Sequence, residues 1–412
     1  MSRRDVEFLC AVVIVGLLAG VAGLSTTLLL RALEHLTYHY TFGSLLEGVT
    51  GSSPVRRALG PMVGGALAGL GWWILRSRAD VPSLSAAIAS PERIPLLPFG
   101  IDAALQVLVV GSGASLGREV APRQFAAALG DLGIGWLKRL SPRDREILLG
   151  CAAGAGLGAV YAVPLGGALF ALRIMLRTWQ LRAVGAALIT SSLAVSVASV
   201  LTHNQSILTW PNLHFSYRLI GYALVLGPLT FAVGRVFNRT MAAAHRAALR
   251  RSWLLIPAIA CAGLLTGVCS HWWPHLPGNG RSILSAALAG GMTLATAAAV
   301  LVLKPLLTAV FLRAGATGGM ITPALATGAA AGTLLVLTTN AIAGTQFHVS
   351  AVSMAGAAGV LAITQRAPFW ASIFVWELAR PPLWLLLVFL VAALSAYGLL
   401  RLVERGRGLE RP

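Results

Sequence analysis

Residues 151–164 read CAAGAGLGAVYAVP, and residues 355–368 read AGAAGVLAITQRAP, the same pattern of small and apolar residues closed by a proline. A second correspondence lies upstream of each copy, where residues 117–122 (GREVAP) match residues 318–323 (GGMITP). The two correspondences have nearly the same spacing, 204 and 201 residues. We therefore predict two copies of one structural unit, with the functional site between them at helices that prolines and glycines interrupt.

The composition is typical of an integral membrane protein. Hydrophobic residues make up 57% of the 412 residues and charged residues only 11%, whereas roughly a quarter of a soluble domain is charged. Several apolar segments, such as residues 103–116 and 351–363, are shorter than the ~20 residues that a straight span requires. We therefore predict an all-α polytopic membrane protein in which many helices are short, tilted or broken.

One integral membrane domain is expected over residues 1–412, with inverted-topology repeats at about residues 59–202 and 254–402. The chain ends soon after its last apolar segment, so no cytoplasmic regulatory domain is expected. Interrupted helices at membrane depth survive only where protein or a water-filled cavity covers them. Their presence predicts a pore or a binding site.

The net charge of +18 at neutral pH raises the alternative of a nucleic-acid-binding protein. The basic residues lie between the apolar segments, however, and the positive-inside rule explains that arrangement without a nucleic-acid partner. Residues 203–217 and 271–280 contain tryptophans and no Lys or Arg, so these loops are predicted outside. Both termini are predicted to be cytoplasmic in a multi-pass protein of the cell (inner or plasma) membrane, because basic residues concentrate in residues 3–4, 138–145, 177–182, 235–251 and 401–411.

Glu119 is the acidic residue that stands where a binding site is expected. It lies between an apolar run that ends at Leu116 and a small-residue segment that begins near Pro122, whereas most other acids stand beside arginines in flanks or loops. A proline in the first turn is a helix-start signal, so Glu119 is predicted at or just before a helix N-terminus. Free N–H groups at such a terminus bind either a carboxylate or a small anion.

Two interpretations of Glu119 stay open at this point. In the first, its carboxylate only caps its own helix or pairs with Arg118 or Arg123. In the second, the acid-free helix start at residues 318–323 joins the first one to form a cage of amide donors. One carboxylate can enter or leave such a cage, which favours anions.

At these residues the chain resembles the CLC family of chloride channels and anion/proton antiporters, over nearly its whole length. Residues 117–119 (GRE) are similar to the family's G-R/K-E-G-P element, and residues 315–323 (GATGGMITP) to its G-x-P-G-G-x-F-x-P element. Residues 158–167 (GAVYAVPLGG) and 366–368 (RAP) resemble its two proline elements. The resemblance, to the bacterial branch without regulatory domains, implies two inverted repeats, a homodimer, chloride or another small anion as substrate, and no cofactor.

The resemblance also implies roles for individual residues. Glu119 is the gate, which occupies the anion path when ionised and leaves it when protonated or displaced. No catalytic residue or metal ligand is expected. The anion is expected on the backbone amides of Arg118, Glu119, Val120, Met320 and Ile321, with Ala79, Ser83, Gly318 and Gly319 as further candidates for lining the path.

Four positions differ from the family's pattern. The chloride-contacting serine falls on Ala79, with Ser77 or Ser83 nearby as a substitute. Val120 replaces a glycine, although valine adopts positive φ only at a cost. The tyrosine expected near the C-terminus has no counterpart, because Tyr397 comes too early, and the inner glutamate of the antiporters falls on Ile174. We therefore predict channel-like transport without proton coupling; a proton-coupled antiporter or a fluoride-selective relative is the alternative.

Two alternatives belong to other classes. A non-transporting paralogue is suggested by the changed positions, and an intramembrane enzyme is disfavoured because no paired catalytic groups stand out. The remaining polar residues are interpreted as structural. Cys10, Cys151, Cys261 and Cys269 are expected as small core residues, His35 and His39 at a helix end in the aromatic belt, Asp102 and Asp131 as interfacial caps, Glu377 as a partner of Arg380 or a neighbouring helix, and Gly64, Gly65 and Gly69 as packing surfaces.

Overall fold

The computed structural model describes residues 2–202, 210 and 213–406, and the regular structure of these residues is helical, without a β-strand. Residues 203–209 and 211–212 of the predicted outer loop lie outside the described residues. The first half contains α1 (Arg3–Tyr38), α2 (Leu45–Gly51), α3 (Pro54–Arg78), α4 (Leu84–Ala89), α5 (Leu96–Gly111), α6 (Val120–Gly133), α7 (Pro142–Tyr161), α8 (Pro164–Phe170), the π-helix η1 (Ala171–Leu176) and α9 (Leu181–Thr202). The second half contains α10 (Tyr217–Arg246), α11 (Leu255–Cys269), α12 (Arg281–Leu288), α13 (Leu294–Arg313), α14 (Ile321–Ala343), α15 (Val349–Gln365), α16 (Pro368–Ala379) and α17 (Leu385–Gly406).

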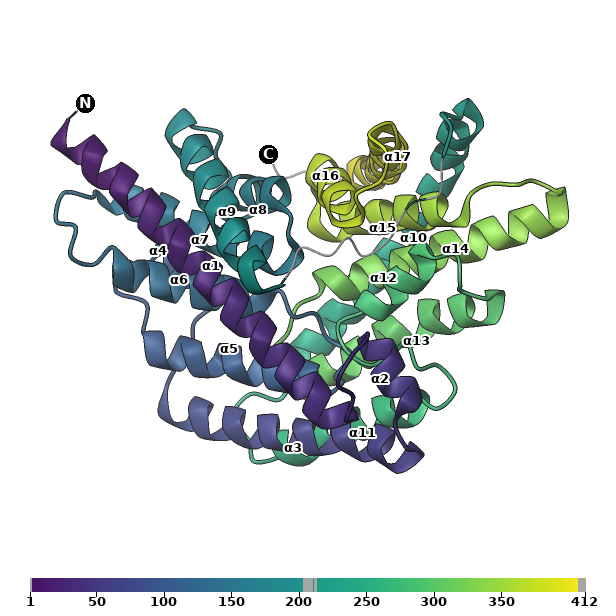
Figure 1. Cartoon of the computed structure of the whole chain (residues 1–412), viewed down its shortest axis with the longest axis horizontal. Helices are drawn as coiled ribbons and strands as arrows, with labels where there is room; N and C mark the ends of the chain where they lie inside the picture. Colours follow the sequence, from purple (N-terminus) through teal and green to yellow (C-terminus); the bar gives the residue numbers. More distant parts are fainter. Residues whose placement is uncertain (1, 203–209, 211–212, 407–412) are drawn as a thin grey trace.

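The helices differ widely in length, as the sequence predicted. Within the described residues, seven helices are long and apolar enough to cross a membrane: α1, α3, α9, α10, α13, α14 and α17. Four further apolar segments are shorter, namely α5, α8 with η1, α11 and α15. Figure 1 shows α1 running diagonally across the molecule, with α7 and α9 of the first half on the left and α13 and α14 of the second half on the right. The prediction of a polytopic helical membrane protein with short and tilted helices is confirmed.

The repeated sequence forms the same backbone twice. Ala162 directly follows α7 and Arg366 directly follows α15. These two residues have nearly equal left-handed φ values of 54° and 53°. In each copy a proline then occupies the first position of the next helix, Pro164 in α8 and Pro368 in α16. Proline suits that position because it has no N–H to leave unsatisfied. The local signals therefore produce the same helix–break–helix unit in both halves of an inverted-repeat fold.

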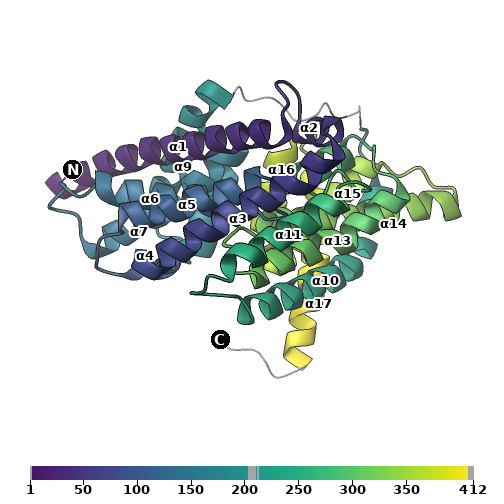
Figure 2. The same ribbon diagram turned by 90° about the horizontal axis from the view of Figure 1, so that it is seen from below.

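The two halves are joined by close helix packing. Helices α3 and α11 lie side by side in both views (Figure 1, Figure 2). A Cβ added at Gly65 would lie 2.6 Å from the carbonyl oxygen of Ile259, and one at Gly69 would lie 2.7 Å from that of Leu255. Small residues let helix backbones approach this closely in membrane proteins. The prediction that these glycines form packing surfaces is confirmed.

The centre of the molecule is formed by the small-residue helices. Helices α7, α14 and α15 are buried over most of their length, and α6 packs against α7. Alanine and glycine dominate these helices, so their backbones pack closely with little side-chain volume between them. The N-termini of α6 and α14 consequently end inside the protein, where their unsatisfied N–H groups are available to a ligand or a side chain.

Candidate functional site

The two glycine-led loops before α6 and α14 meet in the middle of the protein. The N–H of Gly117 donates to the carbonyl of Gly319, and the N–H of Gly319 donates to the carbonyl of Gly117, each over 2.8 Å. This pair of hydrogen bonds joins loops that are about 200 residues apart in the chain. It brings the starts of α6 and α14 together, as expected for a site between two repeats.

Glu119 reaches from one helix start to the other. It is the residue before α6 and is fully buried, yet its carboxylate makes no cap hydrogen bond to α6. Instead, Oε1 accepts a hydrogen bond of 2.5 Å from the N–H of Ile321, the first residue of α14. The carboxylate therefore occupies the positive end of the opposite helix, which a small anion would also occupy.

Two glycines make room for this carboxylate. A Cβ at Gly319 would lie 2.1 Å from Cδ of Glu119, and a Cβ at Gly117 would lie 2.3 Å from its Oε2. Real Cβ atoms do not approach a neighbour this closely, so any larger residue at either position would displace the side chain. The glycines are needed here for close approach, since neither residue has a positive φ.

The two arginines beside Glu119 bind other groups. Nη2 of Arg118 donates to the carbonyl of Val160 over 2.8 Å, and its guanidinium lies 5.3 Å from the ring centre of Tyr161. Nε of Arg123 donates to the backbone carbonyl of Glu119, not to its carboxylate, over 2.8 Å. The interpretation in which Glu119 caps its own helix or forms an ion pair with these arginines is therefore wrong.

Two hydroxyl groups that the sequence reasoning missed complete the contacts of the carboxylate. Oγ1 of Thr322 donates to Oε2 of Glu119 over 3.0 Å, and the phenol of Tyr161 donates to the same oxygen over 3.3 Å. The two hydroxyls are also 2.7 Å apart. Both residues lie in the repeated motifs, where each is a hydroxyl-bearing residue among small and apolar ones. That difference was the sequence feature by which they could have been found. The C-terminal tyrosine considered earlier, Tyr397, packs instead beside Ala396.

The predicted anion ligands fall into two groups. The amide of Ile321 binds the carboxylate of Glu119, whereas the amide of Gly319 is engaged by Gly117. An anion-binding role stays a prediction for the amides of Arg118, Glu119, Val120 and Met320. The same holds for Gly318, which lies against the side chain of Leu116. The valine at position 120 is accommodated without strain, because α6 begins there with no positive φ.

The segment that resembles the family's serine element contributes no hydroxyl to the carboxylate. Ala79 directly follows α3 and packs against the apolar cluster that also includes Leu116. Ser83 is exposed, and its hydroxyl caps α4 by accepting a hydrogen bond from the N–H of Ala86. This placement does not support Ser83 as a lining residue.

Two acidic residues predicted as interfacial caps are buried instead. Asp102 lies within α5 and accepts hydrogen bonds from the side chains of Trp72, Gln106 and Gln124, over 2.7 to 3.0 Å. Asp131 lies near the end of α6 and forms an ion pair of 2.8 Å with Arg145. Trp72, Gln124 and Arg145 lie in other helices, so local sequence could not identify these contacts.

Glu377 was predicted as a structural partner of a neighbouring helix, and this is confirmed. Its carboxylate accepts hydrogen bonds from the N–H groups of Leu165 and Gly166, over 2.9 and 2.6 Å. These are the first free amides of α8, so the carboxylate of α16 caps a helix of the other repeat. The halves are thus joined by a carboxylate at a helix N-terminus for a second time.

The remaining polar residues show no metal chemistry. Of the residues that the structure describes, no group of three or more His, Cys, Asp or Glu side chains could hold a metal ion. His35 stacks on Tyr40 and His39 forms the left-handed end of α1. Cys151 is buried as expected, but Cys10 and Cys261 are exposed on their helices, which corrects their interpretation as core residues.

Lys304 is a buried cation that the sequence reasoning overlooked. It lies within α13 and is fully buried, and its Nζ donates to the carbonyls of Leu276 and Gly278 over 3.1 and 2.7 Å. These bonds fix the loop that leads into α12. A lysine inside a long apolar segment was a sufficient signal, since such residues are rare and costly in membranes.

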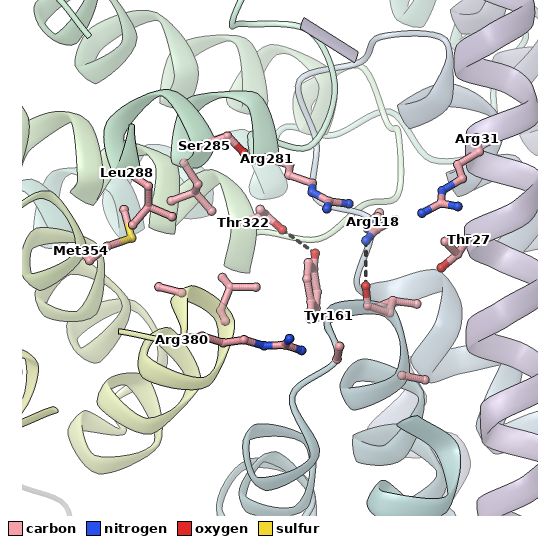
Figure 3. Close-up of a pocket in the computed structure, with 16 residues that line it drawn as sticks. Thr27, Arg31, Arg118, Tyr161, Arg281, Ser285, Leu288, Thr322, Met354 and Arg380 are labelled. Carbon is pink, nitrogen blue, oxygen red and sulfur yellow. Dashed lines mark hydrogen bonds between the residues drawn. The ribbon is translucent and has the colours of Figure 1, made fainter. Parts of the chain in front are cut away.

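A cavity opens beside the Glu119 carboxylate. Its lining includes Tyr161 and Thr322, the two residues whose hydroxyls contact Glu119 (Figure 3). The side chain of Arg118 and the first residue of α12, Arg281, also line it. Its volume is about 110 Å³. Tyr161 and Thr322 thus contact the buried carboxylate and also line this cavity.

The fold and site together define a polytopic membrane protein of inverted helical repeats, with a carboxylate held at a buried helix N-terminus between them. The chain belongs to the CLC family, because the family model described as "Voltage gated chloride channel" matches residues 64–401. It is 30% identical over 378 residues to the voltage-gated ClC-type chloride channel ClcB of Escherichia coli (strain SMS-3-5 / SECEC), with 89% of each chain covered. It is 29% identical over 376 residues to ClcB of Escherichia coli O9:H4 (strain HS), again with 89% of each chain covered.

Solved structures confirm the fold. The chain is similar to a slow cyanobacterial Cl⁻/H⁺ antiporter with a TM-score of 0.80 and 21% identity, covering 99% of both chains. It is also similar to a CLC-type fluoride/proton antiporter, with a TM-score of 0.76 and 19% identity, over 97% of this chain and 96% of that one. Anion transport in the membrane is the common activity of this family.

Proposed function

We propose that the protein moves chloride, or a similar small anion, through a path between the starts of α6 and α14, and that Glu119 gates this path. The observation that carries the proposal is the hydrogen bond of 2.5 Å from the N–H of Ile321 to the Glu119 carboxylate. A carboxylate and a halide compete for the same donors at a helix N-terminus. The gate is therefore a competition between the side chain and the transported anion.

The protonation state of Glu119 decides that competition. When ionised, the carboxylate accepts bonds from Ile321, Thr322 and Tyr161. When protonated, it loses the charge that makes these bonds strong, and an anion takes its place. Acidification from a side that reaches Glu119 is consequently expected to increase anion flux.

We propose that this flux is not coupled to protons. A proton relay to Glu119 from the opposite side requires an ionisable side chain within the apolar region. The position of the antiporters' inner glutamate is Ile174, which lies in η1 and packs against the apolar core, and the adjacent Arg173 stays charged. A chloride gradient is therefore expected to drive no uphill proton movement once the membrane potential is clamped.

The second candidate is a proton-coupled antiporter of chloride or fluoride. It is favoured by the similarity of the fold to a Cl⁻/H⁺ antiporter and to a fluoride/proton antiporter. Stoichiometric uphill proton movement in the gradient assay supports this candidate and overturns the uncoupled proposal.

The experiment that tests transport itself is anion efflux from liposomes that contain the purified protein. Chloride, nitrate and fluoride are compared with protein-free liposomes under the same gradient. Efflux of at least one anion above the protein-free rate supports the proposal. Rates equal to those of empty liposomes for all three, with protein shown to be folded and inserted, indicate a non-transporting member of the family.

We further propose a homodimer in the inner or plasma membrane, with both termini cytoplasmic. Exposed apolar side chains such as Leu165 of α8 and Phe369 of α16 suit contact with lipid or a second copy. Single cysteines at Ser2, before α1, and at Phe42, in the loop after it, test the orientation. An impermeant thiol reagent applied outside is expected to label the Phe42→Cys variant only, and labelling of Ser2→Cys instead means the opposite orientation.

A further inference from the structure

Four arginines from separate parts of the chain line the cavity beside Tyr161, which we name the arginine cavity. Arg31 lies on α1, Arg118 precedes α6, Arg281 begins α12 and Arg380 ends α16. In Figure 3 the guanidinium groups of Arg31, Arg118 and Arg281 point into the same space. The tertiary fold therefore concentrates positive charge where the sequence shows only isolated arginines.

The arginine cavity has no acidic lining residue to balance this charge. Its other polar lining residues are hydroxyl-bearing, including Thr27 and Ser285. Glu34 on α1 stabilises the charged form of Arg281 electrostatically, but it is not part of the lining. Glu34 also acts on Arg31 and Arg118, and Glu377 acts on Arg380. These two carboxylates offset part of the charge, but the four arginines outnumber them and the lining itself stays positive.

Arg118, which lines the cavity, has a side-chain donor without a partner. The residue is 8% exposed, and its Nε is buried without a hydrogen-bond partner in the described structure. Its Nη2 already binds the carbonyl of Val160. A buried guanidinium N–H without an acceptor is costly, so Arg118 would gain from turning this N–H toward an anion in the cavity that it lines.

Repulsion between the arginines contributes to a lowered pKa of Arg281. Burial, followed by the neighbouring charge of Arg118, lowers the pKa of Arg281 to about 10. The charge of Arg31 acts in the same direction. Arg281 is still protonated at neutral pH, so the like charges coexist there, and a multivalent anion between them relieves more repulsion than a monovalent one.

The size and chemistry of the cavity favour a polyatomic anion over a halide. Its volume is about 110 Å³, whereas one water requires only about 10–15 Å³ on the same measure. Guanidinium groups match oxyanions in particular, because two parallel N–H donors meet two oxygens. A tetrahedral oxyanion can use several such pairs at once, while a halide has no fixed pair of acceptors.

We propose that the arginine cavity binds a multivalent oxyanion of the sulfate or phosphate type, and that the bound oxyanion blocks the approach to Glu119 from this side. The regulatory part of the inference rests on the proposed function, since it assumes an anion path at Glu119. The binding part does not. Apolar lining residues such as Leu284 and Leu288 also allow the phosphate to belong to a lipid headgroup.

The first test is binding to the purified full-length protein in detergent. Inorganic sulfate and phosphate are titrated calorimetrically, with chloride and nitrate at matched ionic strength. We expect saturable binding of sulfate and phosphate that the Arg281→Gln variant weakens about tenfold or more, because a charge-assisted bond is lost. Arg56→Gln, an exposed arginine of α3 outside the cavity, is the matched control and is expected to bind within about twofold of the wild type.

A second variant guards against misfolding. Arg281→Lys keeps the charge but loses the paired donors, so it is expected to bind with intermediate affinity. Size-exclusion profiles establish that each variant is folded. Equal sulfate affinity in wild type and in folded Arg281→Gln overturns the proposal, and so does sulfate binding to delipidated protein that is no stronger than that of chloride.

Two further arms identify the source of the oxyanion and its effect. Native mass spectrometry of protein purified with phosphatidylglycerol detects a retained lipid. The cavity is assigned to a lipid headgroup if Arg281→Gln loses this lipid and if the wild type binds sulfate only after the lipid is removed. External sulfate is expected to slow chloride efflux from wild-type liposomes but not from Arg281→Gln liposomes. Chloride efflux without sulfate binding refutes this inference alone, whereas sulfate binding without any anion efflux refutes the proposed function alone.

Discussion

Replacing Glu119 with glutamine keeps the shape of the gate and removes its charge, so this variant measures what the charge contributes. In the wild type the carboxylate accepts its closest hydrogen bond, 2.5 Å long, from the N–H of Ile321. Glutamine can still accept this bond through its carbonyl oxygen. The difference between the two proteins is then the charge assistance at the start of α14.

The size of the effect follows from the contacts. A hydrogen bond to a charged group contributes about 1.5–3 kcal/mol, against about 0.5–1.5 kcal/mol for a neutral pair. For the Ile321 contact alone, the charge is worth roughly 1.4 kcal/mol, which is about a tenfold change in occupancy. Glu119→Gln is therefore expected to let the anion compete about tenfold better at neutral pH, and Glu119→Ala removes the competitor altogether.

The assay is chloride efflux from liposomes at acid and neutral pH, with a potassium ionophore to clamp the potential. Wild-type flux is expected to rise on acidification, because protonation releases Glu119 from its donors. Both variants are expected to show high flux at either pH. Glu92→Gln, an exposed glutamate, is the matched control and should keep the wild-type profile. Wild-type flux and pH dependence in both Glu119 variants, with folded protein, would refute the gate.

Three further changes test the packing at Glu119 and two contacts that join helices elsewhere in the molecule. Gly319→Ala places a Cβ 2.1 Å from Cδ of Glu119, so chloride efflux should lose its pH dependence, as in Glu119→Ala. Gly185→Ala, with open space at its Cβ, is the control. The same pH dependence of efflux in both glycine variants would contradict the packing argument. Glu377→Ala removes the acceptor of two amides of α8 and should lower the free energy of unfolding by about 1–3 kcal/mol, measured by thermal unfolding in detergent; an unchanged midpoint argues against the capping role. Asp144→Asn breaks ion pairs with two arginines at 2.7 and 3.0 Å and should cost a similar amount, whereas a variant as stable as the wild type shows that these pairs contribute little.

The sequence by itself determined the class of fold and the position of the helix breaks. Hydropathy predicts membrane spans because a segment inside the lipid bilayer must be apolar. Proline and glycine change the backbone only within a few residues of themselves, so their effects can be predicted locally. The paired prolines, Pro164 and Pro368, were predicted to interrupt helices, and each begins a new helix after a break. The same local argument placed Glu119 directly before α6.

Only the tertiary structure decided what these local elements bind. Glu119 caps α14 of the other repeat, and its hydroxyl partners are Thr322 of the same helix and Tyr161 of α7. Asp102, predicted at an interface, is buried among side chains of three helices for the same reason. Such contacts depend on which helix packs against which, and that is set by the sum of many small packing terms across the chain. No pattern within one segment contains that information. The repeats and their two helix starts could therefore be predicted from the sequence, while the side chains that meet between them could not.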